Sequence, residues 1–159
     1  MKVVTIADMA DLSARAAGQP RKRLNLNLHP VPDDPVQRML NALEPGTYVR
    51  PHRHEGRWEL FVLLSGSCVV LTFADHGRVA DRVVLSPATA LVAEIPEGTW
   101  HTVLPLEPGT MIFESKTGPY RPAEVKDFAP WAPVEGEPGA AAFRQWLEQA
   151  QVGNRPPAA

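Results

Sequence analysis

The chain has 159 residues, and its 16 lysines and arginines nearly balance 18 aspartates and glutamates, for a formal net charge of −2 at pH 7. This length suits one domain with a real core, and the balanced charge lacks the basic footprint of a nucleic-acid-binding protein. No apolar run approaches the roughly 20 residues that span a bilayer, and the acidic N-terminus does not fit a signal peptide. We therefore expect a cytoplasmic protein that binds neither nucleic acid nor membrane.

Two short elements are predicted before the main part of the chain. Apolar residues at helical spacing predict a helix over residues 7–17, and Gly18 is expected to end it in the left-handed conformation. Residues 24–29 ("LNLNLH") alternate leucines with polar side chains, which predicts a strand with one apolar face. Its polar face is expected to meet solvent, and lining a pocket is the alternative.

The middle of the chain reads as a series of short strands. Between residues 36 and 115, apolar runs recur every 8–12 residues and are divided by glycine and proline, as in "EPG", "EGR" and "PEG". No helical period of useful length interrupts them, which disfavours a parallel βαβ sheet. The pattern predicts an all-β sandwich or barrel over about residues 24–116, within one domain that covers residues 1–159.

The C-terminal part changes character. Residues from 117 onward are rich in proline and are expected to wrap the barrel as an extended strap, with Phe128 and Trp131 as apolar anchors. The segment "AAAFRQWLEQAQ" then predicts an amphipathic helix, so that strap and helix together occupy residues 117–152. This helix either docks on its own barrel or covers a dimer partner, and the sequence leaves both open.

The stretch "TYVRPHRHEGRWEL" carries the clearest chemical signal. If it begins as a strand, His52 and His54 share one face, about 7 Å apart at Cα. The turn after them brings Glu59 into the neighbouring strand, and His101 follows a second turn in "IPEGTWHTV". A single buried histidine is usually a satisfied core residue. The joint pattern of three histidines and one carboxylate instead favours a metal site.

The same residues carry a family resemblance. Gly46, His52-x-His54, Glu59 and Gly66 stand at the spacing of the first cupin motif, and "PEGTWH" resembles the core of the second. In the second motif, the leading glycine and the closing asparagine are replaced by Ala90 and Pro105. The resemblance covers about residues 36–115.

The resemblance implies a cupin double-stranded β-helix, a jelly-roll barrel, to which the residue pattern adds short helices at both ends. It also implies that His52, His54, Glu59 and His101 are the four ligands of one divalent transition metal per chain. Imidazole and carboxylate suit Fe, Mn, Zn, Ni or Co, so the identity of the metal stays open. Cupins are commonly dimers, and a homodimer is expected on that ground.

A narrower resemblance is carried by "LNLNLH", "DDPVQRMLNALEPGTYVRPHRH" and "FESKTGPY". These segments look like the WbuC-type cupin metalloproteins, whose genes often lie near those for cell-surface polysaccharide synthesis. The resemblance reaches from the first strand to about Tyr120. It implies a sugar-related context without specifying a reaction.

Side chains near the predicted metal extend the hypothesis. Arg50 is expected on the same face as the histidines, where it either pairs with Glu114 or binds a substrate carboxylate or phosphate. Tyr48 is a candidate hydrogen-bond donor to substrate at the rim, with core packing as the alternative. Glu114 is the candidate catalytic acid or base, and Lys116 is expected to be a solvated strand end.

Three functions remain open from the sequence. In the first, the metal acts as a Lewis acid or an O₂-activating centre on a small polar or anionic molecule, which makes an isomerase, epimerase or dioxygenase a candidate. In the second, the chain is a non-catalytic, metal-dependent module that binds or senses a small molecule. A structural metal with a closed coordination shell is the third.

Overall fold

The structure is a computed structural model, and it describes residues 1–157. No helix within this range is both long and apolar enough to cross a membrane. The described elements in chain order are α1 (Ile6–Ala17), β1 (Arg23–Asn27), β2 (Val36–Leu43), β3 (Glu59–Ser65), β4 (Cys68–Phe73), β5 (Val79–Leu85), β6 (Val92–Ile95), β7 (Trp100–Pro105), β8 (Thr110–Thr117), the 3₁₀ turn η1 (Val125–Asp127) and α2 (Ala140–Gln149).

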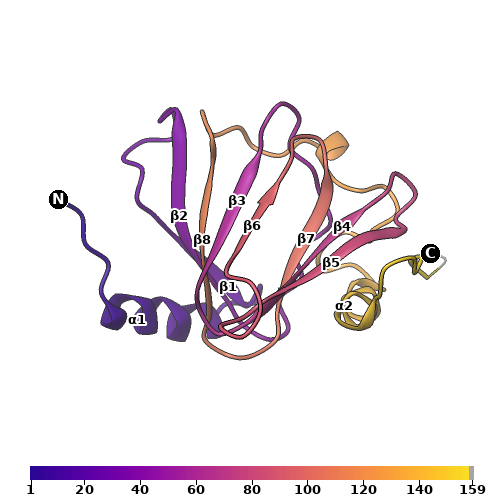
Figure 1. The fold of residues 1–159 in the computed structure, drawn as a ribbon, viewed down its shortest axis with the longest axis horizontal. Coiled ribbons are helices and arrows are strands. Elements are labelled where there is room, and N and C mark those ends of the chain that lie inside the picture. Colours follow the sequence, from indigo (N-terminus) through magenta and orange to yellow (C-terminus); the bar gives the residue numbers. More distant parts are fainter. Residues whose placement is uncertain (158–159) are drawn as a thin grey trace.

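The strands form two antiparallel sheets that face each other (Figure 1). One sheet has the order β1-β2-β8-β3-β6 and the other the order β5-β4-β7. Neighbours such as β2 and β8 are far apart in the chain, which is the long-range pairing expected of a jelly roll. The prediction of an all-β fold with short helices near both ends is confirmed.

Helix α1 begins with a capping box. The hydroxyl of Thr5 accepts a hydrogen bond from the backbone N–H of Asp8, and the Asp8 carboxylate accepts one from the Thr5 N–H. The helix packs Leu12 and Ala16 against the outer side of β2. The expected left-handed ending is wrong, because Gly18 has a φ of −79° and continues in the right-handed region.

The apolar floor of the barrel is made by side chains from both sheets. Phe61 and Ile112 point inward from the larger sheet and pack against Val70 and Val103 of the smaller one. Cys68 is fully buried in this cluster, and burial raises the pKa of its thiol to about 12. It is therefore a small core residue.

Gly66 turns the chain between β3 and β4 in a crowded place. Its φ is +72°, in the left-handed region that favours glycine, and a Cβ there would lie 2.7 Å from the Cα of Thr110. The closing glycine of the first motif therefore has a local packing reason. Any side chain at this position would push β8 away from the turn.

The strand expected over residues 47–54 is wrong. This segment is extended, but its only ladder-like pairing in the described structure is at His52, whose backbone exchanges hydrogen bonds with His101. Pro51 lacks an N–H, and the N–H of Arg53 donates to Asp127 in the C-terminal strap. The segment thus lies between the start of β7 and the strap instead of joining a regular sheet.

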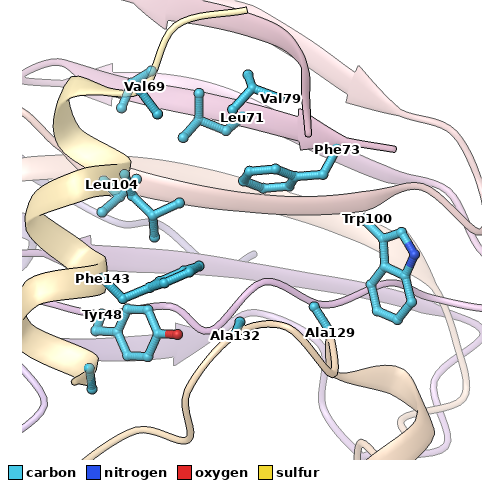
Figure 2. Close-up of a cluster of buried hydrophobic side chains, with 13 residues drawn as sticks. Tyr48, Val69, Leu71, Phe73, Val79, Trp100, Leu104, Ala129, Ala132 and Phe143 are labelled. Atoms are coloured by element: carbon cyan, nitrogen blue, oxygen red, sulfur yellow. The ribbon is translucent and has the colours of Figure 1, made fainter. Parts of the chain in front are cut away.

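The C-terminal strap and α2 cover the outside of the smaller sheet. Figure 2 shows Phe143 of α2 close to Tyr48, with Phe73 and Leu104 of the sheet in the same cluster. Trp131 of the strap contacts both Phe73 and Phe143, as expected of an apolar anchor. The helix therefore docks on its own barrel, which is the first of the two alternatives left open by the sequence.

One ion-pair cluster ties the strap to β1. Glu135 accepts two hydrogen bonds from the guanidinium of Arg23, at 2.8 Å each, and pairs with Arg21 at 2.8 Å. Burial acts to raise the pKa of Glu135, but these arginines more than offset it, so that the pKa lies below its ordinary value. The charged Glu135 carboxylate thus attaches the strap to the start of β1 through ion pairs.

Replacing Glu135 with glutamine is expected to lower the free energy of unfolding by about 1 kcal/mol at pH 7. Because the folded-state pKa is lowered, the stabilisation is present above the unfolded value and is lost as pH falls through the folded one. Urea unfolding between pH 7 and pH 3 should therefore show wild type and Glu135→Gln converging at the acidic end. A difference that stays constant with pH would contradict this assignment.

Candidate metal centre

The structure brings the four predicted ligands together. His52 and His54 lie on the extended segment before β3, Glu59 is the first residue of β3, and His101 is the second residue of β7. One ligand atom from each residue lies within 4.8 Å of those of the other three. Glu59 and His101 are almost fully buried, and the other two are partly exposed toward the barrel mouth.

Backbone carbonyls orient two of the imidazole rings. The Nδ1 of His52 lies 3.0 Å from the carbonyl oxygen of Arg50, and the Nδ1 of His101 lies 2.8 Å from that of Thr99. A carbonyl can only accept, so Nδ1 carries the hydrogen in both rings and the Nε2 lone pair is free to coordinate. Burial first, and then the neighbouring His101, lower the pKa of His52 to about 3, which keeps the ring neutral.

Two further observations fit a bound cation. The Nε2 of His101 faces a carboxylate oxygen of Glu59 at 2.8 Å, and two lone pairs at this distance repel unless a proton or a cation is shared between them. The Nε2 of His54 is buried without a hydrogen-bond partner among the described residues. A buried nitrogen without a hydrogen-bond partner is available to coordinate a metal ion. The four residues therefore fit a first-row divalent metal.

Glu59 is the anionic member of the set. Burial acts to raise the pKa of its carboxyl group, but the ammonium of Lys116 and the neighbouring imidazoles of His101 and His54 hold it well below the ordinary value. The carboxylate is thus charged and ready to act as a ligand at neutral pH. One of its oxygens faces His101, and the other lies 3.0 Å from the Lys116 ammonium.

Lys116 is the residue that sequence reasoning missed. We expected a solvated strand end, but its side chain is only 18% exposed and lies between Glu59 and Glu114, at 3.0 and 2.6 Å. The register of the sheet places Lys116 directly opposite Glu59. The sequence could have indicated this position, because Glu114 and Lys116 are two residues apart on one strand and therefore share one face.

The candidate acid or base Glu114 lines a cavity at the barrel mouth. One of its oxygens accepts a hydrogen bond from the Asn41 amide at 2.6 Å, and the other contacts Lys116. Burial raises the pKa of Glu114 to about 8, and the charge of Glu59 adds to this effect. The pairing of Glu114 with Arg50, one of the two alternatives for that arginine, does not occur.

Arg50 and Tyr48 are placed differently from their prediction. The guanidinium of Arg50 donates to the carbonyl oxygens of Ala129 and Ala132 in the strap. The hydroxyl of Tyr48 donates to Pro133, and its ring is buried against Phe143. Arg50 still borders a cavity that His52 and His54 also line, but Tyr48 does not, because the segment is not a regular strand. Tyr48 is therefore a core residue, and substrate binding by Arg50 stays a prediction.

The cavity has a volume of about 530 Å³ and reaches from β1 to the candidate metal ligands His52 and Glu59. Its wall is polar, with amides and charged groups, and its floor is apolar. Asn25 on β1 is among the lining residues, so this part of the polar face serves the cavity, which was the less favoured alternative. The wall also includes Asn41, Glu114 and Lys116, and the floor is formed by Phe61, Val103 and Ile112.

Residues 4–85, just over half of the chain, match the model of a family described as a domain of unknown function, DUF6016. The chain belongs to this family. A search of curated proteins found no match.

Solved structures similar to this DUF6016 chain share its fold. TT1209 from Thermus thermophilus has 20% identity and a TM-score of 0.53, over 74% of this chain and 97% of that one. KdgF from Halomonas sp. has 20% identity and a TM-score of 0.51, over 65% and 84%. A cupin superfamily protein from Desulfitobacterium hafniense has 18% identity and a TM-score of 0.50, over 67% and 86%. The cupin fold predicted from the motifs is thereby confirmed.

Proposed function

We propose that this DUF6016 chain binds one divalent transition metal through His52, His54, Glu59 and His101, and acts with it on a small anionic molecule. The observation that carries the proposal is the convergence of these four ligand atoms within 4.8 Å. It is supported by the backbone carbonyls that turn two Nε2 atoms inward and by the orphaned Nε2 of His54. When bound, the metal supplies Lewis-acid polarisation of a ligand oxygen or, as Fe(II), O₂ activation.

The side chains of the cavity have distinct roles in this proposal. Glu114 takes or returns a proton at the ligand atom nearest to it, because it borders the same cavity as His52 and Glu59. Asn41 and Lys116 hold its carboxylate in one orientation. The apolar floor of Phe61, Val103 and Ile112 excludes water from below.

The class of ligand follows from the lining and from the narrower resemblance. Amide groups such as those of Asn25 and Asn41 suit hydroxyl groups, and Lys116 suits an anion. The WbuC-like segments add a context of cell-surface polysaccharide metabolism. We therefore propose a sugar derivative that carries a negative charge, and an isomerase, epimerase or dioxygenase activity.

A second candidate function is a metal-dependent binding or sensing module without turnover. One observation favours it: both carboxylate oxygens of Glu114 already have partners, Asn41 and Lys116. A base that is engaged on both sides has to release one contact before it can take a proton from a ligand. In this alternative the same cavity holds the ligand, and ligand binding changes the association of the chain with a partner. We propose that the partner is a second copy of the chain.

Metal analysis tests the proposal directly. Protein purified without added metal is expected to carry about one transition-metal ion per chain. His52→Ala should carry at least about tenfold less, because loss of a ligand exceeds the effect of losing an outer partner. His76→Ala is the matched control, since His76 is exposed in the turn between β4 and β5. Equal metal content in wild type and His52→Ala would overturn the metal site.

The choice between the two functions rests on Glu114. For an enzyme, the metal-loaded chain converts a charged sugar derivative or small organic acid in a screen. Glu114→Gln, which keeps the shape of the side chain, should then remove turnover while leaving binding intact. Tight binding across the screen with no turnover in wild type would select the binding module.

A further inference from the structure

A second cavity lies on the strap side of the candidate metal centre. It has a volume of about 530 Å³ and, like the first, borders His52 and Lys116. Six cationic side chains and a single carboxylate, Glu135, line it. This is a strong local excess of positive charge in a chain whose formal net charge is −2. The cationic residues are Arg21, Arg23, Arg50, Arg57, Lys116 and Arg121.

Four of these six cations have partners inside the protein. Arg21 and Arg23 are both paired with Glu135. Lys116 lies between two glutamates, and Arg50 donates to carbonyl oxygens of the strap. Their charge and their donors are therefore largely used by the fold.

Arg57 and Arg121 are different. Within residues 1–157 neither has an acidic partner within ion-pair distance nor a side-chain hydrogen bond. Arg57 follows the His54 turn and is half-buried, whereas Arg121 is an exposed residue of the strap. Both also border a smaller cavity of about 130 Å³ that His54 shares. Two guanidinium groups without internal partners thus lie beside one of the metal ligands.

We propose that Arg57 and Arg121 form an oxyanion-binding subsite that holds the carboxylate or phosphate group of the ligand. The proposal rests on the proposed function, because it gives the ligand a second point of attachment next to the metal. A planar guanidinium pairs with such a group through two parallel hydrogen bonds, and the charges of these two arginines, which have no internal partner, attract it. Since Arg121 lies on the strap, the strap would then help to determine which ligand binds.

The dimensions suit a ligand that spans both ends. Cavities of about 300–1,000 Å³ hold molecules of small-drug size, so this one has room for a phosphorylated or carboxylated monosaccharide. His52 and Lys116 border both cavities, so a ligand held at the arginines reaches the candidate metal centre. The polar wall of Asn25 and Asn41 lies beyond them.

Calorimetric titration of the full chain tests the subsite. Inorganic phosphate and malonate are the two probes, and each is titrated into protein as purified and into protein stripped of metal with a chelator. We expect at least one probe to bind stripped protein, because the arginines act without the metal. The probe that binds more tightly identifies the oxyanion. Binding of neither probe to the stripped chain overturns the proposal.

Variants locate the binding. Arg57→Gln and Arg121→Gln should each weaken the preferred probe about tenfold, and the double variant by more, since each removes a charge-assisted pair. Arg78→Gln, an exposed arginine between β4 and β5, is the matched control and should leave binding unchanged. Unchanged binding in the double variant, with an unchanged thermal melt, also overturns the subsite.

The outcomes separate the subsite from the metal site. Metal content of the double variant should equal that of wild type, because neither arginine is a ligand. If wild type holds no metal but phosphate still binds through the arginines, the subsite stands and the metal proposal fails. If metal is bound but the arginine variants bind the probes like wild type, the metal proposal stands and the subsite fails.

Discussion

Replacing Lys116 with methionine is expected to lower the free energy of unfolding of the metal-free chain by about 3 kcal/mol, because it removes one partner of a buried ion pair. The ammonium lies 3.0 Å from Glu59 and 2.6 Å from Glu114. Burial acts to lower the pKa of Lys116, but the two carboxylates raise it above its ordinary value, so the group is charged at neutral pH. Without it, Glu59 is a buried carboxylate whose compensating cation is missing.

Lys126→Met is the matched control. Lys126 pairs with Glu124 at 3.2 Å, but both side chains are 69% exposed, so its loss should change stability by no more than about 0.5 kcal/mol. Urea unfolding of metal-free wild type and both variants gives the comparison. Equal effects of the two substitutions would show that Lys116 is solvated, as its sequence position first suggested.

Metal addition provides a second readout for Lys116→Met. A divalent cation at the four ligands supplies the positive charge that the variant lacks, so metal should raise its melting temperature more than that of wild type. The affinity for metal should be no lower than in wild type, because Lys116 is not a ligand. A variant that loses metal like His52→Ala would contradict this role.

Replacing Phe143 with alanine is expected to lower the free energy of unfolding by about 4 kcal/mol, since it removes a large ring from a closed core. The ring is 4% exposed and contacts Tyr48, Trp131 and Trp146. Its loss leaves a cavity where α2, the strap and the smaller sheet meet (Figure 2). Urea unfolding of Phe143→Ala and wild type measures the effect.

Gln145→Ala on the same helix is the control, because Gln145 is exposed and alanine favours helix. Its effect should lie within about 0.5 kcal/mol. If Phe143→Ala behaved like Gln145→Ala, α2 would not be docked on the barrel in solution. The helix face would then be available for the dimer contact that the sequence left open.

The candidate ligands were predictable because their signal is local or motif-like. His52 and His54 are two residues apart, and Glu59 follows within one turn. Only His101 is distant, and its own turn, "PEGTW", marked it. The side chains around the metal were harder, because their positions depend on pairings between remote strands. Lys116 meets Glu59 across the β3–β8 register, and Asn41 meets Glu114 across β2 and β8.

Errors arose where a local rule was carried into irregular backbone. Alternation along a strand predicted that Tyr48 and Arg50 would both be free to reach a ligand, but their segment bonds to the strap and to β7 instead of a sheet partner on both sides. The Arg50 guanidinium donates hydrogen bonds to carbonyl oxygens of the strap, and the Tyr48 ring packs in the hydrophobic cluster under α2. Pro51, which lacks a backbone N–H, already argued in the sequence against a regular strand here.

By itself the sequence determined an all-β strand series, two flanking helices and the residues able to bind a metal, because periodicity, turn residues and ligand chemistry act over a few neighbours. Tertiary structure alone decided the rest of the site. It set the burial of Lys116 between two carboxylates, the engagement of Arg50 and the availability of Arg57 and Arg121. The physical reason is that charge compensation depends on which groups approach within a few ångströms, and strand register and the path of the strap control that approach.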